Sequence, residues 1–375
     1  MELVKTEIGF LPHDWEVCKL LDYTNLLTGL TYTPDNVKKN GLLVLRSSNI
    51  QNSRLSFDDN VYVDCNVDIN KYLKKNDILI CVRNGSANLI GKNAIAIKDY
   101  NATFGAFMSV LRGKDNDFIF QLFQKGDIQK RIKRNSSATI NQITKSDFES
   151  ILIPMPCPKE RKEIVSILSN LDNLIDSIQE LLDKKEKIKK SIMNTYFRIT
   201  EKKSKKLLGD LLKFQYGDGN IIPDNGGKYP IYGANGIVGG FTEYNSEDEI
   251  VIGHIGTPGT VIWAEGKNFV TYNGTITTAI NPNLIDLKYM YYLLLNYDIP
   301  SIAFGSSQPF LSYDKLKKVE VYIHDNINNQ KMISGILTDV DNEILLLKEK
   351  MLKYKNIKSG MMEDLLTGKV RLKYE

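Results

Sequence analysis

Two stretches of 38 residues decide the fold of this chain: ERKEIVSILSNLDNLIDSIQELLDKKEKIKKSIMNTYF at 160–197 and NQKMISGILTDVDNEILLLKEKMLKYKNIKSGMMEDLL at 329–366. A shift of 169 residues lays one over the other with 12 identical positions. The identities pair Asp172 with Asp341 and Lys189 with Lys358. An internal repeat of this length indicates that a whole structural unit has been duplicated.

Apolar residues recur in both stretches at alternating spacings of three and four. This spacing predicts a long helix with one narrow apolar face, which a second helix must cover. We expect the two copies to cover each other, although two unrelated surface helices, each packed on its own domain, are the alternative. Lysines interrupt the apolar face of both predicted helices toward their C-terminal halves. They either fix the register of the helix pair or leave room for another subunit. The predicted seam consists of Leu168, Leu171, Ile175, Ile178, Leu182, Leu337, Val340, Ile344, Leu347 and Met351.

The sequence before each helix has short apolar runs separated by glycine, asparagine and other turn-forming residues, which is the pattern of short strands. Residues 204–212 partly resemble residues 18–27, so the two halves also begin alike. We therefore predict an α+β fold in which two mixed domains are each followed by a long helix. The predicted strands are 42–45, 77–82, 94–97, 106–111 and 151–154 in the first half and 249–253, 260–264, 269–272, 275–280 and 319–323 in the second.

The repeat also defines a domain organisation. The first domain is predicted at 1–158 with its helix at 159–199, and the second domain at 200–328 with its helix and a C-terminal tail at 329–375. The charged run at 201–206 is most simply a solvated hinge between the two halves.

Composition excludes several classes of protein. With 375 residues, 42% hydrophobic, 25% charged and a net charge of +4, the chain matches a globular protein of more than one domain. It has no apolar stretch of the length of a membrane span and no signal peptide at its start, so we expect a cytoplasmic protein. Four cysteines without paired spacing and three histidines favour neither a disulfide framework nor a metal site.

Common catalytic motifs are missing. The chain contains no G-x-S-x-G, H-E-x-x-H or C-x-x-C. The segment 85–93 has five residues between its glycines where a phosphate-binding loop needs four, so a strand and turn is the better interpretation. The string Asn281-Pro-Asn-Leu lacks the second proline and the aromatic residue that hold a flipped base in DNA methyltransferases. The chain is therefore predicted to bind rather than to catalyse.

Several local strings resemble one known family, the DNA specificity subunits of Type I restriction-modification systems. They are IGFLPHDWEV at 8–17, VLRSSNI at 44–50, DILICVR at 77–83, YPIYGANG at 229–236 and LLTGKVRL at 365–372. The resemblance extends over essentially the whole chain. Its opening, its second domain and its ending all contribute.

The resemblance implies two target-recognition domains, each reading one half of a split site in double-stranded DNA. Two long helices, packed as an antiparallel coiled coil, would hold the domains apart in a pseudo-twofold arrangement and act as a ruler. The chain itself would bind no cofactor and no metal. Modification (methyltransferase) subunits that use S-adenosylmethionine, and restriction subunits that use ATP and Mg, would assemble around it.

Base edges in DNA are read mainly by Arg, Asn and Gln, while Lys, Ser and Thr mostly hold phosphates. Polar residues at predicted strand ends and turns are therefore candidate DNA contacts, with an ordinary solvated loop residue as the alternative at each. The basic runs Lys133-Arg134 and 184–190 could also meet phosphates, but solvated helix faces are the simpler interpretation. The candidates are Arg46, Ser48, Asn49, Arg83, Asn84, Lys92, Tyr232, Asn235, His254, Thr257 and Lys267.

Two other functions compete with DNA recognition by a non-catalytic subunit. The first is a coiled-coil scaffold that binds proteins through its two domains without reading DNA. The second is an enzyme that modifies DNA by itself, which the missing motifs disfavour.

Overall fold

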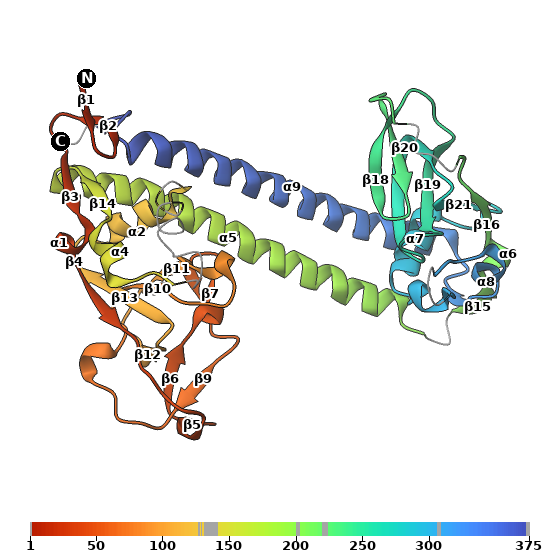
Figure 1. Ribbon diagram of the computed structural model, residues 1–375. Coiled ribbons are helices and arrows are strands. Elements are labelled where there is room, and N and C mark those ends of the chain that lie inside the picture. Colours follow the sequence, from red (N-terminus) through yellow and green to blue (C-terminus); the bar gives the residue numbers. More distant parts are fainter. Residues whose placement is uncertain are drawn as a thin grey trace. The chain divides into compact units, whose positions relative to one another are not determined.

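The computed structural model describes residues 2–126, 128, 130, 142–199, 203–219, 224–305 and 309–372. The chain forms two compact units, one of Met1–Ser177 with Met351–Glu375 and the other of Ile178–Lys350. Each unit contains one mixed domain and a part of both long helices, α5 (Pro158–Phe197) and α9 (Ile327–Leu365), which are green and blue in Figure 1. Among the described residues, no helix has the length and apolar character needed to cross a membrane.

The first domain is built on two four-stranded sheets. One has the order β11-β10-β13-β4 and is antiparallel throughout, and the other has the order β12-β6-β9-β5 with β12 parallel to β6. The strands of the first sheet are β4 (Thr24–Thr28), β10 (Ile78–Cys81), β11 (Asn93–Ile95) and β13 (Met108–Gly113). Those of the second are β5 (Val37–Lys38), β6 (Leu42–Leu45), β9 (Val61–Val63) and β12 (Ala102–Phe104).

Short hairpins and turns complete this domain, and helix α2 (Asn116–Gln124) joins it to the long helices. The buried face of α2, with Phe118 and Phe123, shares one core with Ile164 and Leu168 of α5 and with Leu365 of α9. The smaller elements are β1 (Leu3–Thr6), β2 (Gly9–Pro12), β7 (Ile50–Gln51), β8 (Arg54–Leu55), η1 (Pro34–Asn36), η2 (Ser47–Asn49), η3 (Ile69–Lys71) and η4 (Ala87–Leu89).

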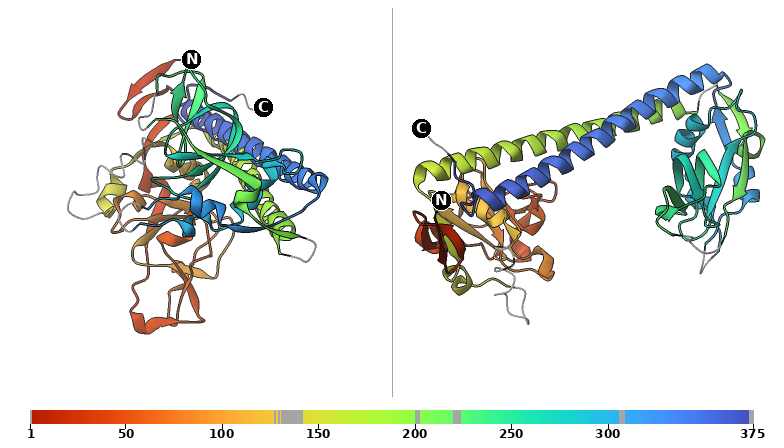
Figure 2. Two further views of the ribbon diagram at one scale, coloured as in Figure 1. Left: turned by 90° about the vertical axis from the view of Figure 1, so that its right-hand side faces the viewer. Right: turned by 90° about the horizontal axis from the view of Figure 1, so that it is seen from above.

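The second domain has one six-stranded sheet of order β16-β21-β19-β20-β17-β18. Helix α7 (Leu287–Leu295) lies between this sheet and α9, because its buried tyrosines and leucines share a core with Ile250 of the sheet and Leu337 of α9 (Figure 2). The strands are β16 (Leu212–Tyr216), β17 (Tyr229–Gly233), β18 (Gly236–Phe241), β19 (Ser246–Gly253), β20 (Val261–Val270) and β21 (Gly274–Ala279), with η5 (Ile299–Ile302) after α7.

The two halves repeat the same elements where each begins and where each long helix starts. In the first half β3 (Glu16–Lys19) leads into α1 (Leu20–Tyr23) and β4, and it pairs with β14 (Leu152–Met155) just before α5. In the second half β15 (Ser204–Leu207) leads into α6 (Leu208–Leu211) and β16, and it pairs with β22 (Glu320–Ile323) just before α9. The helices α4 (Lys145–Glu149) and α8 (Tyr313–Lys317) also correspond. The predicted α+β fold with an internal repeat is confirmed.

The apolar stripe of each long helix faces inward. All ten predicted seam positions are buried or half-buried, and Leu168 and Leu337 are fully buried. Ion pairs join the two helices within each unit, with Asp172 to Lys358 in one and Lys189 to Asp341 in the other. Because low residue numbers on α5 pair with high numbers on α9, the helices run antiparallel.

Every predicted strand overlaps an observed one. Two details differ from expectation, one in a strand and one in the predicted hinge. The strands predicted at 260–264 and 269–272 form the single strand β20, because Gly266 at φ +63° donates its N–H to Asp248 Oδ1 and carries the strand through a bulge. The described part of the predicted hinge is not solvated throughout, because Lys203 is only 9% exposed and donates to the carbonyls of Tyr196 and Arg198 at the end of α5. Glu201 and Lys202 lie outside the described residues.

Candidate functional site

The candidate residues of the first domain gather around η2. Asn84 Nδ2 donates to Ser47 Oγ at 3.1 Å, and Lys92 Nζ donates to the Ser47 carbonyl at 3.2 Å. Both side chains come from the segment that follows β10, so the folded chain brings residues more than 35 positions apart onto one short turn. The fold therefore brings candidates from two separate segments together around Ser47.

Asn49 is not available to DNA, which corrects one of the candidates. Its side chain is completely buried; its Oδ1 accepts from the Arg46 N–H, and its Nδ2 donates to the carbonyls of Ser56 and Asp59. An amide with this set of internal partners holds the turn in shape. Asn49 is a structural residue that positions Arg46 and Ser48.

Arg46 and Ser48 lie at a pocket of about 720 Å³. Arg46 Nη2 pairs with Asp59 at 2.9 Å, whereas Arg46 Nε and Ser48 Oγ are buried and have no hydrogen-bond partner among the described residues. Unsatisfied buried polar atoms are rare in folded proteins, and they often await a ligand or water. The apolar lining comes mainly from Leu30, Tyr32, Pro34, Val37, Phe107 and Met108.

Arg83 is the most accessible basic candidate in this domain. It is exposed, and its guanidinium lies over the ring of Phe107 at 5.3 Å from the ring centre. Phe107 is itself 56% exposed, which is unusual for such a large apolar side chain. A cation stacked on an exposed ring suits contact with nucleic-acid bases. Phe107 was missed from the sequence because it fell within the strand predicted at 106–111, whereas in the structure it lies in the turn between β12 and β13.

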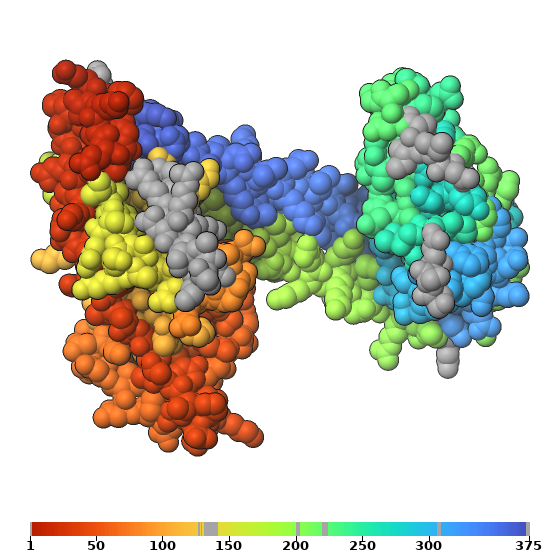
Figure 3. Space-filling view, viewed as in Figure 1, coloured from red at the N-terminus to blue at the C-terminus, as the bar shows by residue number. Residues whose placement is uncertain are grey.

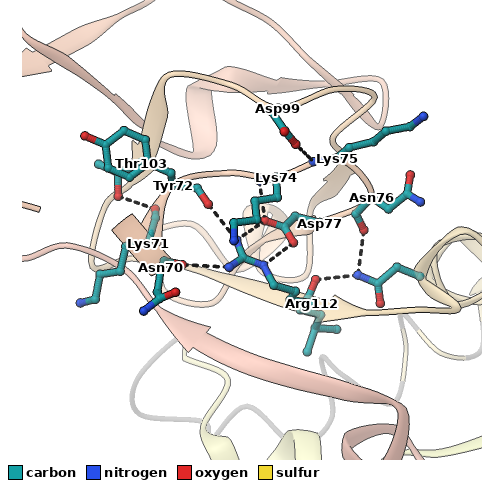
Figure 4. A network of polar contacts seen from close by, with 12 residues as sticks. Asn70, Lys71, Tyr72, Lys74, Lys75, Asn76, Asp77, Asp99, Thr103 and Arg112 are labelled. Carbon is teal, nitrogen blue, oxygen red and sulfur yellow. Dashed lines mark hydrogen bonds and ion pairs between the residues drawn. The ribbon is translucent and has the colours of Figure 1, made fainter. Parts of the chain in front are cut away.

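The polar network in Figure 4 fixes the loop that precedes β10. Arg112 on β13 donates to both oxygens of Asp77 at 2.8 and 2.6 Å, and to the carbonyls of Asn70 and Tyr72. The hydrogen bonds that Arg112 donates to Asp77 raise the pKa of Arg112, so the guanidinium stays charged. The clamp holds the loop rigid while Lys74 and Lys75 remain exposed on it. These lysines are possible phosphate contacts that the sequence did not single out.

In the second domain, Asn235 and Thr257 come together. Asn235 is exposed in the turn between β17 and β18, and Thr257 Oγ1 donates to the carbonyl of the neighbouring Ala234 at 3.0 Å. The loop that carries Thr257 is tightly held, because a Cβ on Gly259 would lie 2.5 Å from the Pro300 backbone. Two exposed polar side chains thus lie on adjoining loops.

Tyr232 and His254 are buried, which corrects two further candidates. Tyr232 is 7% exposed, and burial raises the pKa of its hydroxyl. His254 is 4% exposed, with Nδ1 at 2.6 Å from the Leu311 carbonyl and its ring stacked on Tyr216 at 4.1 Å. Both side chains support the loops from inside and do not face a ligand.

Lys267 is exposed, but it belongs to a different setting from Thr257. It lies opposite Glu247 in the β19–β20 ladder, with Nζ 4.5 Å from the centre of the Tyr244 ring. A hydrogen bond with Tyr244 raises the pKa of Lys267. The side chain is a positive charge on the sheet surface and not part of the Asn235–Thr257 loops.

The two basic runs differ in whether the structure describes them. Lys133 and Arg134 lie outside the described residues. In the run 184–190, Lys185 and Lys189 pair with acidic residues of α9, while Lys184, Lys187 and Lys190 are exposed. Among the described residues, no three His, Cys, Asp or Glu side chains come together in a way that could hold a metal ion.

The fold and the loops define a duplicated α+β protein, with two domains that each present polar loops and join a pair of antiparallel helices. The chain belongs to the family described as Type I restriction modification DNA specificity domain, which it matches at residues 12–190 and 200–353. Membership implies sequence-specific recognition of DNA.

Individual relatives agree with this assignment. The chain is 26% identical to the putative Type I restriction enzyme MjaX specificity subunit of Methanocaldococcus jannaschii, over 98% of this chain and 96% of that protein. It is 32% identical to the EcoKI specificity subunit of Escherichia coli strain K12, over 45% of this chain and only 38% of that protein.

A solved structure of the S subunit of a Type I restriction-modification system from M. genitalium has the same fold. Its TM-score is 0.71 at 19% identity, with 96% of this chain and 97% of that chain covered. The predicted family and the predicted architecture of two repeated domains with long helices are therefore confirmed.

Proposed function

We propose that this chain is the non-catalytic specificity subunit of a Type I restriction-modification complex and recognises a bipartite DNA site, one half with each domain. The observation that carries the proposal is the duplication of the loop-bearing domain. One domain presents Arg83 beside Phe107, and the other presents Asn235 beside Thr257. Two different loop sets on repeated scaffolds suit two different half-sites.

The long helices support a split site with a fixed gap. Helix α5 has 40 residues and α9 has 39, which at 1.5 Å per residue corresponds to about 60 Å. One turn of DNA is about 34 Å, so helices of this length are sufficient for half-sites one turn apart. The gap in the recognised site is thus proposed to follow helix length.

The outer surface of the helices supports docking of modification subunits. In the second unit, Leu181 of α5 is 41% exposed, and Leu345 and Leu346 of α9 are 56% and 64% exposed. Figure 3 shows an outer side of α9 (blue) that no other described element covers in that view. Exposed leucines on a helix are typical of a surface that binds another protein.

Catalysis and cofactors are proposed to reside on the partners. The modification subunits would supply S-adenosylmethionine chemistry, and the restriction subunits would use ATP and Mg, with this chain directing both to DNA in the cytoplasm. The proposal follows from family membership together with the absence of common catalytic motifs in the sequence.

The decisive experiment is to express the chain with its modification subunit and map methylated bases genome-wide. A split methylated motif that appears only when both proteins are present is the expected result. Unchanged methylation would contradict the proposal. Co-purification with the modification subunit without any methylation would favour the protein-binding scaffold, and methylation by the purified chain alone would favour an enzyme.

A further inference from the structure

A half-buried aspartate in the first unit joins three helices. Asp172 of α5 accepts a hydrogen bond from Lys358 Nζ of α9 at 2.6 Å and from Gln121 Nε2 of α2 at 3.2 Å. The side chains of Asp172 and Lys358 are only 15% and 14% exposed, and Gln121 is 2% exposed. The recognition domain is thereby bonded to both long helices at one carboxylate, which we call the Asp172 node.

The second unit contains an equivalent arrangement. Asp341 of α9 accepts from Lys189 Nζ of α5 at 2.6 Å and from the Tyr292 hydroxyl of α7 at 2.9 Å. Tyr292 is 1% exposed, and Lys189 Nζ also lies 5.5 Å from the centre of its ring. Burial raises the pKa of Tyr292, so its hydroxyl stays protonated as a donor. We call this group the Asp341 node.

The two nodes are related by the internal repeat. Asp172 and Asp341 are equivalent under the 169-residue shift, and so are Lys189 and Lys358. Each node therefore combines the aspartate of one copy with the lysine of the other. The domain helices supply different donors, Gln121 in the first copy and Tyr292 in the second. The aspartate and the lysine are common to both copies of the repeat. The group by which the domain helix donates to the aspartate differs between the two domains.

Two other polar contacts near the start of a domain helix each involve only one long helix. Arg161 of α5 pairs with Asp115 before α2, and the equivalent Gln330 of α9 accepts from the Asp286 N–H before α7. Apolar packing places each domain helix against both long helices, but such packing has no fixed donor or acceptor direction. A node adds a directional polar link, because its carboxylate binds both long helices and the domain at once.

The two carboxylates are shielded to different degrees, because the Asp172 side chain is 15% exposed and the Asp341 side chain is 32% exposed. A partly shielded carboxylate that loses a donor gives up a hydrogen bond to a charged group, so the placement of the domain helix that satisfies all three groups is favoured. Buried polar groups have this role in coiled coils, where they fix register more than they add stability.

We propose that the Asp172 and Asp341 nodes are positioning sites that lock each recognition domain to the helix pair and so restrict the complex to one spacing between half-sites. This inference rests on the proposed function. Gln121 and Tyr292 are the informative residues, because they connect the domain to the node while the ion pair joins the helices.

Two substitutions cut the domain link and leave the ion pair in place. Tyr292→Phe removes only the hydroxyl, and Gln121→Met removes the amide at similar length. Matched controls on the same domains are Tyr297→Phe, whose hydroxyl accepts from the Tyr322 N–H, and Gln124→Met, whose amide donates to Asn93 Oδ1. Neither control contacts a long helix through the group that it loses.

The test measures methylation by the complex of full-length chain and modification subunit at sites whose spacer is one base pair too long or too short. Relative to methylation at the correct spacer, we expect this methylation to rise about tenfold in both node variants, because one hydrogen bond to a charged carboxylate restrains the domain. The control variants should keep the wild-type ratio. An unchanged ratio in the node variants would mean that the nodes contribute only stability.

A second measurement does not depend on DNA. Hydrogen exchange of the full-length Tyr292→Phe protein should show amides of α7 exchanging about tenfold faster, with residues 337–341 of α9 unchanged. Wild-type protection of α7 would overturn the inference. If the wild-type complex methylated no split site, the proposed function would fail, and hydrogen exchange would still decide whether the node holds the domain.

Discussion

The guanidinium of Arg371 donates two hydrogen bonds to the carboxylate of Glu160, at 2.6 and 2.8 Å. Arg371 lies in the tail after α9, and Glu160 lies in the first turn of α5, so the end of one long helix is tied to the start of the other. Glu160 is 1% exposed and also accepts from Trp15 Nε1 at 3.1 Å. Arg371 further pairs with Asp14, which raises the pKa of the guanidinium. Three segments of the first unit therefore meet at one buried carboxylate.

Arg371→Met should strongly destabilise the first unit. The substitution leaves Glu160 as a buried charge without its cation, and breaking a buried pair in this way costs about 3–5 kcal/mol. Denaturant unfolding of the full chain, followed through tryptophan fluorescence with Trp15 in the first unit and Trp263 in the second, measures the change. Lys369→Met is the matched control, because Lys369 pairs with Glu363 at the surface and should contribute less than about 1 kcal/mol. Equal losses in the two variants would contradict this account.

The long helices and their seam could be predicted from the sequence because helical periodicity is local. Leu168 and Leu337 occupy equivalent positions of two similar heptad patterns, and both are fully buried. The strands were also found, since short apolar runs between turns are a local signal. The continuity of β20 was missed because it depends on the contact between Gly266 and Asp248, which no local pattern encodes.

The candidate site was predicted less well because burial of a polar side chain depends on distant partners. Asn49 is satisfied by the carbonyls of Ser56 and Asp59, and His254 contacts the carbonyl of Leu311, 57 residues away. In the sequence both looked like exposed loop residues. Lys203 was predicted to be solvated, and this was wrong for the same reason. In the structure its ammonium group donates to the carbonyl of Arg198 at the end of α5.

Acid should destabilise the second unit through His324. Burial, and then the positive charge of Lys203, lower the pKa of His324 below its usual 6.5. The unfolded chain therefore takes up a proton near pH 6.5 while the folded chain does not. The contribution to stability is complete above about pH 6.5 and falls as the pH drops toward the lowered pKa.

His324→Gln should remove this pH dependence. The melting temperature of the full chain, measured from pH 7.5 to pH 5, is expected to fall less steeply in the variant than in the wild type. His13→Gln serves as the control, because His13 is exposed, and it should keep the wild-type slope. A His324→Gln protein that loses stability as steeply as the wild type would exclude His324 as the source.

Arg83→Ala should relax one position in the first half-site and leave the second half-site unchanged. An arginine that reads a base edge contributes about 1–3 kcal/mol of discrimination. Genome-wide methylation by the reconstituted complex reports both halves of the motif in one experiment. Asn235→Ala is the reciprocal control and should affect only the second half-site. A uniform loss of methylation at all sites would instead indicate that Arg83 holds a phosphate.

Substitutions at two leucines on α9 should distinguish an effect on folding from an effect on subunit assembly. Leu337 is fully buried, so Leu337→Ala is expected to cost about 2–5 kcal/mol of stability. Leu346 is 64% exposed, so Leu346→Glu should leave the unfolding free energy within about 0.5 kcal/mol of the wild type. If the outer side of α9 binds the modification subunit, a charge at Leu346 should reduce co-purification and methylation together. Normal assembly of the Leu346→Glu chain would show that the modification subunit docks elsewhere on the protein.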